Sequence, residues 1–102
     1  MAETYVDKVA AAVRQVPSGC VASYGTIGEV AGYARHGRHV GRVMRVMTGV
    51  PWWRVLRADG MIVIRDAELA AEQESRLVSE GVVVVERRVD MSRYAWDGRT
   101  RS

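Results

Sequence analysis

The residues that could do covalent or metal chemistry are few and scattered in this sequence. The single cysteine, Cys20, follows a Pro-Ser-Gly turn, and neither His36 nor His39 lies near it along the chain. Because a thiol becomes reactive beside a cation or a general base, we interpret Cys20 as a small, half-buried hydrophobic residue. The two histidines are three residues apart, but no acidic or sulfur partner completes a metal site. We therefore expect no catalytic centre, no metal and no cofactor.

Two adjacent tryptophans are the second notable feature. Trp52 and Trp53 follow Pro51 in the connection after a cationic helix. Tryptophan is mostly buried somewhere in a folded chain, so the simpler interpretation is that one indole anchors the core and the other covers an edge. The alternative is an aromatic wall of a pocket for a flat ligand, such as a nucleobase.

Arginine supplies nearly all of the positive charge. Of the fifteen Lys and Arg residues only Lys8 is a lysine, and the formal net charge is +3. Arg38, Arg42 and Arg45 share one face of a helix predicted from Gly37 to Met47. The opposite face carries an apolar stripe of Val40, Val43, Met44 and Met47. The small size and basic charge of the domain indicate a nucleic-acid partner only weakly. The three arginines on this helix face show where such a partner would bind.

The elements that must position these residues are short. A first helix is predicted over residues 3–16, and an extended piece over residues 20–23 follows it. Thr26 and Glu29 have the spacing of a capping box, which predicts a second helix that ends near Gly32. Together with the cationic helix, this short helix forms a helix-turn-helix candidate.

The second half of the chain is predicted to hold a hairpin and a helix. Residues 55–57 and 61–64 flank an Asp-Gly turn and are expected to pair as a wing. Asp66 caps a final helix over residues 67–80, which Gly81 closes. Residues 82–85 form a short buried strand. The polar tail over residues 87–102 is anchored by Met91, Tyr94 and Trp96.

Length and composition agree with one domain over residues 1–102. A chain of 102 residues with 48% hydrophobic and 26% charged residues suits a single compact core. No stretch approaches the ~20 apolar residues of a membrane span, and the N-terminus lacks a signal peptide's pattern. One cysteine excludes an intramolecular disulfide. The predicted fold class is α+β, a small winged helix-turn-helix domain, and the expected location is cytoplasmic, on the nucleoid if the source is bacterial.

Five ordered motifs resemble one known family. They are VASYGTIGEVAG at 21–32, GRHVGRVM at 37–44, PWWRV at 51–55, RLVSEGV at 76–82 and VDMSRY at 89–94. In this order they resemble the DNA-binding, active-site domain of the O6-alkylguanine-DNA alkyltransferases, over nearly the whole chain.

The active-site motif of those enzymes is changed here. The family motif is Pro-Cys-His-Arg, in which the cysteine accepts the alkyl group and the histidine helps to deprotonate it. In this sequence Trp52 and Trp53 stand at those two positions. Indole is neither a useful nucleophile toward an alkyl ether nor a base at neutral pH. The chain therefore resembles the alkyltransferase-like proteins, the non-enzymatic branch, which similarly carries Arg-Asp where Arg65 and Asp66 stand.

The resemblance also implies how DNA is bound. The second helix of the helix-turn-helix enters the minor groove, where Gly41 allows close backbone approach and Arg42 and Arg45 contact phosphates. Arg38 matches the arginine that replaces the extruded nucleotide, and Tyr24 matches the tyrosine that rotates its phosphate. The implied lesion pocket consists of Tyr24, Pro51, Trp52, Arg54 and Arg65. Trp53 is expected to pack beneath this pocket. Glu80 lacks the histidine partner of the enzymes and is expected to be a structural helix-end residue.

We therefore expect a non-enzymatic sensor of O6-alkylguanine in double-stranded DNA, which passes the lesion to nucleotide excision repair proteins. We expect the protein to be a monomer and to have no membrane partner. One alternative is a winged-helix regulator without lesion specificity, which would read sequence in the major groove. The Gly-rich start of the cationic helix, and the lack of Asn or Gln on its outer face, argue against such base readout. The other alternative is an alkyltransferase that uses Cys20.

Overall fold

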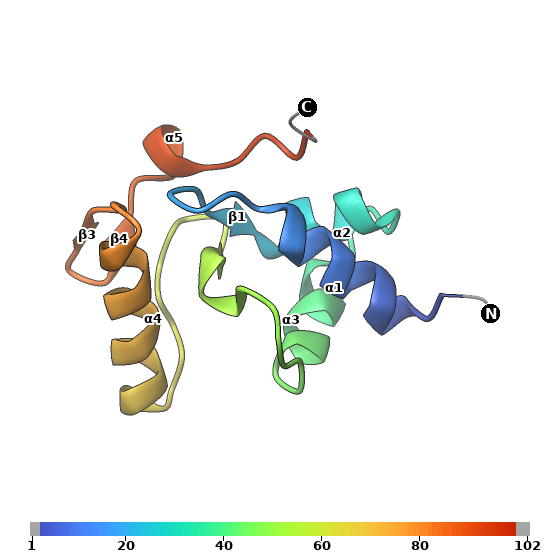
Figure 1. Cartoon of the computed structure of the whole chain (residues 1–102), viewed down its shortest axis with the longest axis horizontal. Coiled ribbons are helices and arrows are strands. Elements are labelled where there is room, and N and C mark those ends of the chain that lie inside the picture. The colour runs from blue at the N-terminus through green and yellow to red at the C-terminus, as the bar shows by residue number, and fades with distance from the viewer. Residues whose placement is uncertain (1–2, 100–102) are drawn as a thin grey trace.

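The computed structural model describes residues 3–99, in which helices are joined by short strands and loops (Figure 1). Buried side chains form two hydrophobic cores on either side of a short parallel strand pair. The elements in chain order are α1 (Tyr5–Gln15), β1 (Ala22–Ser23), α2 (Tyr24–Ala31), α3 (Gly37–Met44), η1, a 3₁₀ turn (Trp52–Arg54), β2 (Val55–Leu56), α4 (Ala67–Ser79), β3 (Val84–Val85), β4 (Arg88–Val89) and α5 (Met91–Tyr94). The small α+β fold predicted from the sequence is confirmed, but several of its details differ.

The start of α2 corrects the predicted capping box. The helix begins at Tyr24 because Ser23 has extended backbone angles and its side chain accepts a hydrogen bond from the Thr26 backbone N–H. Thr26 therefore lies inside the first turn instead of capping it. Gly32 ends the helix at a φ of +95°, in the left-handed conformation that glycine adopts readily. This end agrees with the prediction.

The cationic helix α3 is shorter than predicted. It ends at Met44, not at Met47, because the next three backbone N–H groups donate to carbonyls three residues back. Such i to i−3 bonds tighten the chain into turns at a helix end. Val40 is buried, whereas Val43, Met44 and Met47 are half-buried.

The strand pair β1–β2 sends alternate side chains into the two cores. Ala22 and Val55 are partners in the register, and both pack in the first core with α1, α2 and α3. Val21 and Leu56 are their neighbours, and both pack in the second core with α4. Successive residues of a strand point to opposite faces, so this short pair joins the two cores.

The predicted hairpin between residues 55–57 and 61–64 is wrong. The Asp59-Gly60 turn forms, but β2 pairs with β1 and Met61 forms a bridge with Arg88. The hairpin of this fold is β3–β4 instead. Gly60 explains the close fit of the turn, because a Cβ on it would lie 2.1 Å from the carbonyl oxygen of Val89. Residues 55–57 and 61–64 therefore pair with other parts of the chain and not with each other.

The C-terminal part follows the prediction only in part. The predicted buried strand over residues 82–85 is wrong, because β3 spans only Val84–Val85 and Val85 is 63% exposed. The predicted tail contains β4 and α5. Asp66 caps α4 by accepting from the Glu68 and Leu69 N–H groups. The helix is followed by the hairpin and the single turn α5, so it is not the last helix. Trp96 is buried in the first core, and its backbone N–H donates to Val21. The last three residues of the predicted tail lie outside the described residues. No helix within residues 3–99 has the length and apolar character to cross a bilayer.

Candidate nucleic-acid interface and pocket

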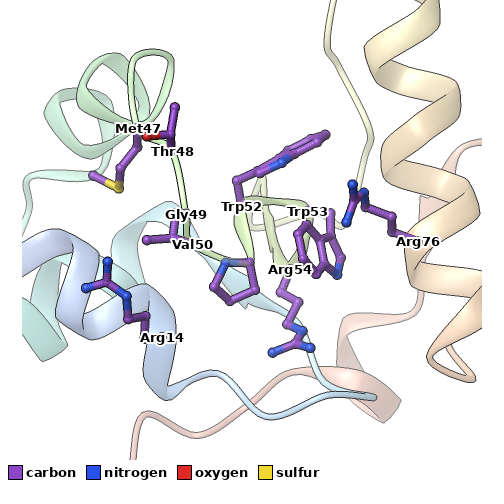
Figure 2. Close-up of a pocket in the computed structure, with 10 residues that line it drawn as sticks. Arg14, Met47, Thr48, Gly49, Val50, Trp52, Trp53, Arg54 and Arg76 are labelled. Atoms are coloured by element: carbon purple, nitrogen blue, oxygen red, sulfur yellow. The ribbon is translucent and has the colours of Figure 1, made fainter.

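A pocket of about 640 Å³ opens beside the segment that joins α3 to β2 (Figure 2). Side chains of α1, of this segment and of α4 line it: Arg14, Met47, Thr48, Gly49, Val50, Pro51, Trp52, Trp53, Arg54 and Arg76. Among the described residues no Asp or Glu lines it. The pocket is therefore aromatic and cationic.

The tryptophan pair stands between the two cores and also lines the pocket. Trp52 packs against the first core and Trp53 against the second. The rings meet edge to face, with their centroids 6.0 Å apart at an interplanar angle of 86°. Both side chains are half-buried. Each indole packs against the margin of one core and also lines the pocket, whereas a flat ligand in that pocket stays a prediction.

Glu80 holds Trp53 and Arg54 through hydrogen bonds. The Trp53 Nε1–H donates to Glu80 Oε1 at 3.1 Å, and the Arg54 Nε–H donates to the same oxygen at 2.9 Å. Arg54 Nη2 pairs with Glu80 Oε2, and Arg54 Nη1 donates to the Val16 carbonyl at 2.9 Å. The expectation that Glu80 is a structural helix-end residue agrees with the structure. Glu80 is the C-cap of α4, and in place of a histidine it accepts hydrogen bonds from Trp53 and Arg54. Trp53 is a wall of the pocket and does not lie beneath it.

The electrostatics of this cluster favour the ionised carboxylate. Hydrogen bonds from Arg54 lower the pKa of Glu80, burial acts in the opposite direction, and the Trp53 N–H lowers it further. The Arg54 and Glu80 side chains are only 15% and 13% exposed. Both ions have lost most of their hydration, so removing one of them would leave the other charge buried and uncompensated.

Arg76 reaches the pocket from α4. Its guanidinium carbon lies 4.5 Å from the centroid of the Trp53 ring, while Arg54 approaches the same indole at 5.5 Å. Figure 2 shows the Arg76 guanidinium pointing toward the tryptophan pair. Its Nε–H donates to Glu72 Oε2 at 2.9 Å, an i to i−4 pair along the helix.

The second candidate surface is the outer face of α3. Arg38, Arg42 and Arg45 are all exposed, whereas Val40 on the other side is fully buried. The predicted separation of a cationic and an apolar face is therefore confirmed. Within residues 3–99 no carboxylate pairs with these three arginines, so the charge is available to an external anion.

Tyr24 lies against α3 and links the two helices. A Cβ built on Gly41 would lie 3.9 Å from Cδ1 and Cε1 of Tyr24, so this glycine faces the tyrosine ring. Burial raises the pKa of the Tyr24 hydroxyl, and the Arg45 charge acts in the opposite direction. Tyr24 is the first residue of α2, where free backbone N–H groups suit a phosphate.

The structure brings together only part of the predicted lesion pocket. Pro51, Trp52 and Arg54 line it, but Tyr24 and Arg65 do not. Arg65 is exposed in the loop before α4. Cys20 is half-buried against the first core and does not line the pocket, in agreement with its interpretation as a hydrophobic residue. No group of three potential metal ligands occurs within residues 3–99.

The sequence did not point to two cationic pocket residues, Arg14 and Arg76, or to the hydrogen bond that holds Trp53. Arg14 lies in the last turn of α1, and no motif pointed to it. The spacing of Glu72 and Arg76 indicates an exposed i, i+4 pair, but nothing in the sequence places Arg76 over an indole. The Trp53–Glu80 hydrogen bond joins residues 27 positions apart, so local spacing could not reveal it.

Fold and surfaces together define a small α+β domain built on a helix-turn-helix with an exposed cationic helix beside a tryptophan-lined pocket. The model of the family "6-O-methylguanine DNA methyltransferase, DNA binding domain" matches residues 4–82. This chain belongs to that family, and the resemblance inferred from the motifs is confirmed.

Named relatives cover almost the whole chain. Alkyltransferase-like protein 1 of Schizosaccharomyces pombe is 33% identical, over 92% of this chain and 95% of the relative. A DNA base-flipping protein of Vibrio parahaemolyticus is 31% identical, over 92% of this chain and 97% of the relative. The crystal structure of S. pombe Atl1 with damaged DNA containing O6-carboxymethylguanine has a TM-score of 0.83 at 32% identity, over 91% and 94% of the two chains.

Proposed function

We propose that this protein is a non-enzymatic sensor of O6-alkylguanine in duplex DNA. Arg42 and Arg45 bind the backbone in the minor groove, and Arg38 takes the place of the extruded nucleotide. The damaged base is held against Trp52. Two relatives support DNA binding with base flipping: one is named a DNA base-flipping protein, and Atl1 was crystallised with DNA containing an O6-alkylated guanine. Extrusion costs a few kcal/mol of stacking and pairing, and less for a lesion that already pairs badly.

One observation carries the non-enzymatic part of the proposal. Trp52 and Trp53 form the pocket wall, at the two positions where the motif resemblance places the family's acceptor cysteine and histidine, and the lone thiol of Cys20 does not line this pocket. An alkyl group placed against Trp52 meets no thiolate and no general base. Binding without reaction leaves the lesion in the DNA, so we propose that the complex marks it for nucleotide excision repair proteins.

The experiment compares binding of the intact protein to two duplexes of one sequence, with and without a single O6-methylguanine. We expect tighter binding to the damaged duplex at each of two salt concentrations, and equal affinity would refute the proposal. Mass spectrometry of the protein after incubation should show no added alkyl group. An alkyl increment that the Cys20→Ala variant abolishes would instead establish a transferase.

Two further outcomes test the remaining parts. Selection from random undamaged duplexes should return no strong sequence motif, whereas a motif would favour a winged-helix regulator. Sedimentation of the free protein should give a monomer. We propose a cytoplasmic location, on the nucleoid if the source is bacterial, because the nucleoid holds the DNA that the protein would bind.

A further inference from the structure

Among the described residues, three arginines line the pocket, and they differ in what their guanidinium groups already bind. Arg54 uses Nε, Nη1 and Nη2 on Glu80 and on the Val16 carbonyl. Arg76 uses only Nε, on Glu72, and within residues 3–99 its two Nη nitrogens have no acceptor. The Arg14 side chain is exposed and has no ion pair among the same residues. Two of the three cations therefore remain available to a ligand.

The Arg76 guanidinium is also held in place. Glu72 fixes it from one side at Nε, and the Trp53 ring supports its flat face at 4.5 Å. A guanidinium that is already oriented loses less freedom when it binds a planar group with two oxygens. In Figure 2 it points toward the tryptophan pair, and Arg14 lies on the other side of the pocket.

The neighbouring carboxylates offset part of the positive charge at the pocket, but they leave the Nη nitrogens of Arg76 without an acceptor within residues 3–99. Glu80 does not line the pocket, and its oxygens accept hydrogen bonds from Arg54 and from the Trp53 indole N–H. Glu72 is bound to Nε of Arg76 and does not line the pocket. The pocket thus offers aromatic surface to an alkyl chain and a free guanidinium edge to an oxyanion.

We propose, on the basis of the function proposed above, that this pocket selects O6 substituents of guanine that end in a carboxylate. Arg76 is the selecting residue and binds the carboxylate through its Nη nitrogens, and Arg14 is the second cation. The carbon chain of the substituent lies on the indoles of Trp52 and Trp53. A neutral alkyl group gains only this apolar contact and therefore binds more weakly.

A DNA phosphate presents the same oxyanion chemistry, so the experiment must separate the two sources. It uses four duplexes of one sequence, which carry guanine, O6-methylguanine, O6-carboxymethylguanine or O6-carbamoylmethylguanine. The last two substituents have nearly the same shape and differ in charge. Wild-type protein is expected to bind the carboxymethyl duplex about fivefold more tightly than the carbamoylmethyl duplex, the effect of one ion pair in a half-exposed site.

Variants then locate the effect. Arg76→Gln should abolish the fivefold difference, and Arg76→Lys should keep part of it, because the charge remains without the flat stacked group. Arg57→Gln is the matched control, since Arg57 is exposed, pairs with Asp59 and does not line the pocket. This control should leave the difference unchanged.

The results distinguish failure of this inference from failure of the proposed function. If O6-methylguanine and guanine duplexes bind equally, the sensor function itself fails. If O6-methylguanine is preferred but the carboxymethyl and carbamoylmethyl duplexes bind equally, only the selection of carboxylates is overturned. A uniform loss for all four duplexes in Arg76→Gln assigns Arg76 to a DNA phosphate and also overturns it.

Discussion

Arg54 at the pocket and the arginines of α3 are the same residue type in opposite situations. Arg54 is 15% exposed, and its donors are bound to Glu80 and a backbone carbonyl. Arg38, Arg42 and Arg45 are exposed, and no carboxylate within residues 3–99 pairs with them. The charge of Arg54 stabilises the fold, whereas the charges of the three exposed arginines are available to a polyanion.

The comparison teaches that the number of arginines in this chain says little about its affinity for DNA. A cation that is satisfied internally releases no counterions when DNA binds, whereas each exposed cation that meets a phosphate does. Removing Arg54 or its partner should therefore act on stability, and removing an α3 arginine should act on binding. The following predictions test this separation, from the largest expected effect to the smallest.

Glu80→Ala should lower the free energy of unfolding by about 3 kcal/mol, because it leaves the Arg54 charge and the Trp53 N–H without their acceptor. Chemical denaturation measures this loss. Glu72→Ala is the control, since it removes the exposed partner of Arg76, and we expect a loss below about 0.5 kcal/mol. Equal losses in the two variants would show that the buried cluster is no more important than a surface pair.

The same cluster should make stability depend on pH. Arg54 lowers the pKa of Glu80 in the folded chain, so its contribution is fully present above the ordinary carboxyl range. Stability should fall as the pH drops through the folded pKa, from about pH 4.5 downward. Glu80→Gln should reduce this dependence and leave the smaller share of exposed Asp7, Asp59 and Asp90, whose pKa values are lowered by hydrogen bonds. If the pH dependence of stability is the same in Glu80→Gln as in the wild type, Glu80 does not cause it.

Arg38→Ala should act on lesion recognition without an effect on stability. If Arg38 replaces the extruded nucleotide, its loss should reduce the preference for O6-methylguanine over guanine by about tenfold, or about 1.4 kcal/mol. The ratio of the two dissociation constants measures this preference. Arg38→Lys, which keeps the charge, separates insertion into the duplex from phosphate binding. A uniform loss of affinity in Arg38→Ala would make Arg38 a backbone contact only.

Arg42→Ala should weaken binding to damaged and undamaged duplexes alike, by about threefold. A phosphate contact carries no lesion information, and its loss should reduce the slope of log K against log salt by about 1. Titration at several salt concentrations checks both statements. Arg57→Ala, at an exposed arginine outside α3, should leave the slope unchanged. A changed lesion preference in Arg42→Ala would contradict the assignment.

Gly41→Ala has a small expected effect and separates two explanations of this glycine. A Cβ there would meet the Tyr24 ring at an ordinary contact distance of 3.9 Å, so the better helix propensity of alanine should raise stability by about 0.5–1 kcal/mol. If Gly41 also permits close approach of α3 to DNA, affinity for all duplexes should fall. Thermal unfolding together with duplex titration measures both, and unchanged affinity would leave Gly41 with the Tyr24 contact alone.

The sequence by itself determined the features that depend on local spacing. The opposite faces of α3 follow from a period of 3.6 residues, and the caps of α4 follow from Asp66 and Gly81 at its ends. Cys20 was correctly interpreted as a half-buried hydrophobic residue because no base or cation lay near it in the sequence. The motifs also identified the family.

Only the tertiary structure decided which distant segments meet. The Asp59-Gly60 turn predicted a hairpin, but β2 pairs with β1 because Leu56 and Val55 complete two different cores there. Ser23 replaced Thr26 as a cap because β1 runs directly into α2.

The pocket shows the same limit. Spacing along the chain could place neither Glu80 under Trp53 nor Arg76 over it, because these contacts join η1 to α4. Periodicity reports which face of one element is buried, and it carries no information about the partner that buries it. The sequence therefore determines where each arginine stands along the chain. The packing of the helices determines which acceptor binds its guanidinium group.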